Sequence, residues 1–144
     1  MGAFGALIVL LGIVSTAVGA EAGNVARAMF TTDVVEREPV DRVLVLSNKR
    51  HRIYFFTDLR HFEGQTIIHR WVHDGKVVAA VPFEVKGPRW RVYSAEDLNS
   101  DALGKWMVIV TDSRGWPLKA AIFRYVAADG DGDNSVIVPP DAHP

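Results

Sequence analysis

The stretch QTIIHRWVHDGKVVAAVPFEV, residues 65–85, decides the fold. It contains two runs in which side chains of one face alternate with those of the other, and the dipeptide Asp74-Gly75 separates them. Asp-Gly between two such runs is a specific signal for a tight β-hairpin, because both residues accept the positive φ of a type I′ turn. We therefore expect antiparallel strands over residues 65–73 and 76–85.

Strand-like segments bounded by turn residues recur on both sides of this hairpin. They cover residues 25–32, 42–46, 52–58, 90–94, 105–111 and 118–126. Short strands at this spacing, with no long amphipathic helix to cover a parallel sheet, are typical of an all-β domain. We expect an immunoglobulin-like antiparallel β-sandwich of seven to eight strands, preceded by an N-terminal hydrophobic helix.

Alternation within the strands also predicts which side chains face the core. In each strand, large apolar or aromatic residues two positions apart share one side. The predicted core residues are Ile67, His69, Trp71, Val77, Ala79, Val81, Phe83, Trp106, Val108 and Val110.

The chain has 144 residues and no cysteine. That length suits one domain, which can bury a sizeable core without covalent staples. The absence of cysteine excludes thiolate nucleophiles, redox CxxC motifs and cysteine-ligated zinc. The domain must therefore hold together by packing alone.

The first 20 residues have the composition of a leader. Residues 4–20 are apolar or small apart from Ser15 and Thr16, and Val18-Gly19-Ala20 offers a cleavage site before Glu21. The same run could remain as an anchor, spanning roughly 25 Å as a helix. We expect residues 1–20 to be a signal peptide or a retained transmembrane anchor, residues 21–126 a β-sandwich domain, and residues 127–144 a flexible acidic, proline-rich tail.

Charge is nearly balanced overall, at a formal net charge of -1, but it is unevenly spread. Residues 47–91 hold nine Lys and Arg against four Asp and Glu, and the segments on either side are acidic. The excess is either scattered solvated charge or a basic face for phosphate, a lipid headgroup or an acidic partner. A net charge near zero argues against nucleic acid as a partner.

Arg89-Trp90-Arg91 is the most suggestive local pattern. On a regular strand, Arg89 and Arg91 face one way and Trp90 the other. The arginines form either an anion- or partner-binding strip, or a solvated face paired with nearby acids over a core tryptophan. Arg70 and Trp116 are further candidate contacts.

Metal and catalytic motifs are absent from the sequence. His69 and His73 are about 13 Å apart along a strand, too far to share a metal, so we expect His69 to be a hydrogen-bonded residue beside Trp71. The series Asp129, Asp131 and Asp133 departs from a calcium loop at the glycine and glutamate positions. No nucleophile is spaced next to a base, so we expect no metal, no cofactor and no enzyme activity.

From Tyr54 to about Tyr125 the chain resembles the bacterial family called domain of unknown function 2914 (DUF2914). The matching residues are Tyr54-Phe55-Phe56-Thr57, His69-Arg70-Trp71, Gly75-Lys76, Gly87-Pro88-Arg89-Trp90-Arg91-Val92-Tyr93-Ser94, Gly104-Lys105-Trp106 and Asp112-Ser113-Arg114-Gly115. The resemblance implies a small envelope-associated bacterial domain and brings no activity with it.

These observations favour a non-enzymatic interaction module on the periplasmic side of the bacterial cytoplasmic membrane, anchored there or soluble if cleaved after Ala20. We expect an accessory or structural subunit of a larger membrane-associated complex, such as a respiratory or photosynthetic one. The alternative is a carbohydrate- or peptidoglycan-binding module, which needs exposed tryptophans. A second alternative is an enzyme with a site assembled from distant strands.

Overall fold

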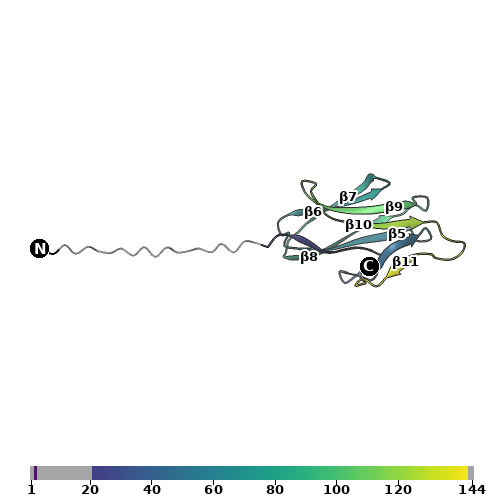
Figure 1. Cartoon of the computed structure of the whole chain (residues 1–144), viewed down its shortest axis with the longest axis horizontal. Helices are drawn as coiled ribbons and strands as arrows, with labels where there is room; N and C mark the ends of the chain where they lie inside the picture. Colours follow the sequence, from purple (N-terminus) through teal and green to yellow (C-terminus); the bar gives the residue numbers. More distant parts are fainter. Residues whose placement is uncertain (1, 3–20, 143–144) are drawn as a thin grey trace.

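The computed structural model describes residues 21–142 together with residue 2, and this part is all β (Figure 1). It contains eight strands of six residues or more, one on each predicted segment, and three shorter strands. The strands are β1 (Asn24–Thr31), β2 (Val34–Val35), β3 (Glu38–Pro39), β4 (Arg42–Ser47), β5 (Arg52–Arg60), β6 (Thr66–His73), β7 (Lys76–Glu84), β8 (Arg89–Asp97), β9 (Gly104–Asp112), β10 (Pro117–Val126) and β11 (Val136–Val138).

Two sheets form a sandwich. The small sheet has the strand order β1-β5-β8, and the large sheet has the order β11-β4-β10-β9-β6-β7. A separate two-stranded ribbon joins β2 to β3. The expected N-terminal helix and both interpretations of the leader fall on residues that lie outside the described part. Within the described part, no helix has the length and hydropathy needed to cross a membrane.

The hairpin at Asp74-Gly75 forms as predicted. Asp74 and Gly75 have φ values of 49° and 78°, and β6 pairs antiparallel with β7. A bulge shifts the register beyond Trp71, which pairs with Ala79, so that Val72 pairs with Val77. The extra residue moves Val77 to the outer face, where it is 59% exposed, and its assignment to the core was wrong.

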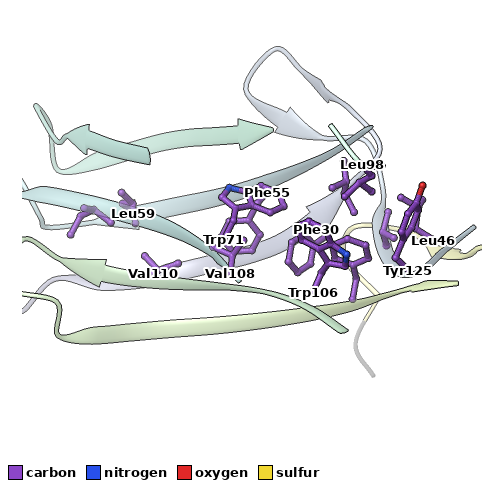
Figure 2. Packing of buried hydrophobic residues seen from close by; sticks show 14 of the residues in the cluster. Phe30, Leu46, Phe55, Leu59, Trp71, Leu98, Trp106, Val108, Val110 and Tyr125 are labelled. Atoms are coloured by element: carbon purple, nitrogen blue, oxygen red, sulfur yellow. The ribbon is translucent and has the colours of Figure 1, made fainter. Parts of the chain in front are cut away.

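Aromatic side chains from both sheets fill the core (Figure 2). The Phe30 ring from β1 packs against three others, with centroid distances of 5.0 Å to Phe55, 5.8 Å to Trp71 and 4.7 Å to Phe123. Phe30 and Phe55 belong to the small sheet, and Trp71 and Phe123 to the large one. Tilted and edge-on aromatic contacts therefore join the two layers, and each pair adds about 1 kcal/mol beyond its buried area.

One strand pair departs from the predicted antiparallel arrangement. β4 runs parallel to β10, with Arg124, Tyr125 and Val126 paired to Val45, Leu46 and Ser47. The first long strand, β1, pairs with β5 in the small sheet, and the chain then crosses over to place β4 at the far side of the large sheet. The first two long strands, β1 and β4, thus lie in different layers.

The segment after Val126 folds back onto the domain, in contrast to the expected flexible tail. β11 pairs antiparallel with β4 (Figure 1). The Ala128 amide donates to Asn48 Oδ1 at 2.9 Å, and the Ser47 amide donates to Ser135 Oγ at 2.8 Å. Composition predicted disorder because glycine and aspartate dominate the segment. Short side chains nevertheless bond the neighbouring backbone, and the β-branched run at 136–138 suits a strand.

We expect removal of residues 127–144 to lower the free energy of unfolding by about 2 kcal/mol, because the β11 pairing and the partly buried Ile137 are lost. Urea denaturation of the full and truncated chains measures this difference. The substitution Asp131→Asn, in the exposed loop, is the control and should leave the urea midpoint unchanged. An unchanged midpoint for the truncated chain would restore the flexible-tail interpretation.

Candidate functional site

A buried polar network crosses the core at His69. Its ring lies within hydrogen-bond distance of two hydroxyl groups, with Nδ1 at 2.8 Å from Ser94 Oγ and Nε2 at 3.0 Å from Thr57 Oγ1. Trp71 Nε1 also donates to Ser94 Oγ, at 3.0 Å. Thr57 and Ser94 are in the small sheet and His69 is in the large one, so the network joins the layers with polar bonds.

The side chains of this network are buried, so the His69 ring has no contact with solvent. His69 and Thr57 are fully buried and Ser94 nearly so. Both hydroxyl partners can donate as well as accept, so either neutral tautomer of the ring is satisfied. Burial lowers the pKa of His69 to about 3. His69 lies beside Trp71 as predicted, and neither His51 nor His61 takes part in the network.

Asp58 lies on the outer face of the small sheet, away from the core, and binds three arginines there. Its side chain is only 1% exposed. Oδ1 accepts from Arg60 Nε at 2.9 Å, and Oδ2 accepts from Arg27 Nη2 and Arg89 Nη2, each at 3.2 Å. Burial alone would raise the pKa of this carboxyl, but the bonds from Arg60, Arg89 and Arg27 outweigh burial and lower it.

Glu38 brings a second carboxylate to the same place from the β2–β3 ribbon. It accepts two bonds from Arg27, at 2.8 and 3.0 Å, and another from Arg91 Nη1. The bonds from Arg27 and Arg91 lower the pKa of Glu38 to about 2. The ribbon turns at Glu36 and Arg37, whose φ values of 51° and 62° cost roughly 1–2 kcal/mol each for residues other than glycine.

We call this group the arginine cluster. Its members come from the three strands of the small sheet and from the ribbon. They are Arg27, Glu38, Asp58, Arg60, Arg89 and Arg91. Arg89 and Arg91 therefore share one side of β8 as predicted, and both are paired with nearby acids. Trp90 faces the other way and packs against the core, as the second interpretation of this motif proposed.

The other predicted site residues are dispersed. Trp71 and Trp106 are buried, whereas Trp116 lies in the β9–β10 turn and is 68% exposed. Asp133 pairs with Arg50 at 2.8 Å. Among the described residues, no three histidine, aspartate or glutamate side chains come together in a way that could hold a metal ion.

Arg70 lies on the outer face of the large sheet, and this face is unusually apolar. Cross-strand pairing places Arg70 beside Ala80 and Ile109, and Ile109 beside Ala120. The next row joins Val77, Val72, Met107 and Ile122. The Arg70 guanidinium bonds Thr111 Oγ1 at 3.2 Å through Nε. We call the following residues the apolar face: Ile68, Val72, Val77, Ala80, Pro82, Met107, Ile109, Ala120 and Ile122.

A sheet with one face in water normally alternates apolar and polar residues. The apolar face breaks this rule over four adjacent strands, β7, β6, β9 and β10. Of its large apolar side chains, Val77 and Ile122 are exposed and Val72 is buried. Apolar surface shared by adjacent strands is a feature of interaction sites. Sequence reasoning missed the face, although a signal was present: residues 107–110, MVIV, form a continuous apolar run instead of an alternating one.

Comparison with known proteins confirms the resemblance noted in the sequence. Residues 64–125 match the family model described as "Protein of unknown function (DUF2914)". The match covers β6 through β10 except the last residue of β10, and excludes the motif at Tyr54. No curated protein matches the chain. The large-sheet strands that carry the apolar face therefore lie within the matched segment.

We expect Asp58→Asn to lower the free energy of unfolding by about 3 kcal/mol, because three guanidinium groups would lose a buried carboxylate. Asp97→Asn is the matched control, since Asp97 pairs with Arg52 on the same sheet but is exposed. Chemical denaturation measures both variants. Equal denaturation midpoints for the two variants would show that the buried ion pairs of Asp58 contribute no more to the free energy of unfolding than the exposed pair of Asp97.

We expect stability to fall as the solution is acidified, because of His69. Its pKa is about 3 in the folded chain and about 6.5 in the unfolded chain, so below pH 6.5 the unfolded state binds a proton that the folded state does not. The loss amounts to about 2 kcal/mol between pH 7 and pH 5. Denaturation curves of His69→Gln should lack this slope, and His51→Gln should keep it. A slope that survives in His69→Gln would assign it to other groups.

Proposed function

We propose that this chain is a non-enzymatic interaction module that docks on a larger protein through the apolar face. The proposal rests on physical grounds, because the matched family is one of unknown function. The observation that carries the proposal is the run of outward apolar residues across four strands, with Arg70 at its centre. Water contact with this surface is unfavourable, and a protein partner would remove it.

Charge selects the kind of partner. The outward positions of β7, β6, β9 and β10 include three cations, Arg70, Lys105 and Arg124, and one acidic residue, Glu84 at the end of β7. A second copy packed face to face would oppose like charges, which costs free energy. A partner with an apolar surface and a carboxylate opposite Arg70 would satisfy both features. We therefore commit to a larger acidic-and-apolar protein surface as the occupant.

The setting of this docking is proposed from the sequence. The leader-like composition of residues 1–20 supports export, with the domain on the periplasmic side of the bacterial cytoplasmic membrane, anchored or released by cleavage after Ala20. An accessory or structural subunit of a membrane-associated complex, respiratory or photosynthetic, fits a small domain with one large docking surface.

We also infer that the sandwich is immunoglobulin-like. Hairpins β6–β7 and β9–β10 stay within the large sheet, whereas the connections β5–β6, β7–β8 and β8–β9 cross between the layers. Such crossing connections are a feature of Greek-key sandwiches. The alternative function, a carbohydrate-binding module, is weakly supported, since Trp116 is the one exposed tryptophan and a single ring in a turn is a poor stacking platform.

We expect a charge placed on the apolar face to disrupt docking. In full-length chain solubilised from membranes with detergent, Ile122→Lys and Val77→Lys should each reduce recovery of the cross-linked partner at least tenfold. Both side chains are exposed, so the fold should tolerate the changes. Val35→Lys is the matched control, because Val35 is equally exposed but lies on the β2–β3 ribbon.

The partner is identified by mass spectrometry of the cross-linked product. Loss of the same partner in the two face variants and its retention in Val35→Lys would support the proposal. Equal recovery in all three variants would overturn it. Recovery of lipid in place of a protein would also overturn it, since it would assign the face to a membrane.

A further inference from the structure

The arginine cluster lies on the outer face of the small sheet and is independent of the apolar face, which belongs to the large sheet. Four guanidinium groups surround two carboxylates there. With all six groups ionised, the cluster keeps two unbalanced positive charges. A concentrated excess of guanidinium charge is what oxyanion sites use.

Within the described part of the chain, several N–H donors of the cluster have no bonding partner and could donate to a ligand. Arg89 bonds Asp58 through Nη2, and Arg91 bonds Glu38 through Nη1, whereas a guanidinium carries five N–H donors. The two residues are two positions apart on one side of β8, about 7 Å along the strand. The Arg89 side chain is 48% exposed. Both forks can therefore converge on one oxyanion from solvent.

Glu38 already occupies the place where such an anion would bind. Its carboxylate bridges Arg27 on β1 and Arg91 on β8 and is 43% exposed. The ribbon that carries it pairs only two residues on each side, Val34 with Pro39 and Val35 with Glu38. Asp58 is different, because it is buried and belongs to the sheet itself. The cluster thus has one fixed carboxylate and one that can be exchanged.

An open depression of about 230 Å³ borders the cluster. Its lining residues include Arg37 and Arg91 together with three aromatic residues, Phe83, Trp90 and Tyr93. It adds another cation beside Arg91 and an aromatic wall, so it could hold the organic part of a ligand whose anionic group lies on the cluster.

We propose that the arginine cluster is a binding site for a phosphate group, which takes the place of Glu38 between Arg27 and Arg91. With Glu38 displaced, four guanidinium groups face only the Asp58 carboxylate and three positive charges are unbalanced. A dianionic phosphate offsets more of this excess than the single charge of Glu38 does, and its oxygens fit the paired donors of guanidinium groups. A free phosphate ester and a phospholipid headgroup share this chemistry. The inference does not depend on the proposed docking, because the two surfaces are on opposite sheets.

The first experiment is a calorimetric titration of the full chain with inorganic phosphate at low ionic strength. We expect saturable binding with one phosphate per chain. Glu38→Gln removes the competing carboxylate and should tighten binding about tenfold, whereas the double variant Arg89→Gln, Arg91→Gln should weaken it at least tenfold. Lys105→Gln, on the opposite sheet, is the control for general charge and should behave as the wild type.

Glu38→Gln keeps the test free of folding artefacts, because a damaged fold would weaken binding and not tighten it. Absence of saturable binding in the wild type and in Glu38→Gln, or equal affinity of the two, would overturn the proposal. Vesicles of phosphatidylglycerol in phosphatidylcholine separate the sources. Vesicle binding that phosphate abolishes would assign the site to a headgroup, and phosphate binding without vesicle binding would assign it to a soluble ester.

Discussion

The contact of aromatic rings across the sandwich is the constraint on which the rest of the structure depends. The chain has no cysteine, so no covalent bridge ties the two sheets together. Phe30 meets Phe55, Trp71 and Phe123, and the buried bonds of His69 to Thr57 and Ser94 run through the same layer. Because these groups come from both sheets, the faces that point outward are fixed at the same time.

The outward face of the large sheet is apolar and that of the small sheet is charged. This difference follows from the register in which the strands pair. On the large sheet, cross-strand register brings apolar residues into rows with Arg70 among them. On the small sheet, register brings Arg27, Asp58 and Arg91 into one row. One face is thus suited to excluding water and the other to holding an anion. The two proposed sites lie on opposite sheets, so a ligand at one would not compete with a ligand at the other.

The sequence predicted the elements that have strong local signals. Asp74-Gly75 located the hairpin, and period-two alternation placed Trp71, Trp106 and Val108 in the core. The β2–β3 ribbon escaped prediction, because strands of two residues show no period and Glu36-Arg37 is not a typical turn pair. The partners of Arg89 and Arg91 lie 31 and 53 positions away along the chain, so no local pattern could identify them. The bulge that turned Val77 outward is likewise invisible in the sequence.

The pairing of β11 with β4 has a consequence for biosynthesis. β11 is made last, so one edge of β4 has no partner until translation of the domain is nearly complete. Unpaired strand edges in incomplete chains favour association with other chains. The last strand of the described domain, only three residues long, therefore also covers an edge of β4, and that edge stays open to other chains until this strand has been synthesised.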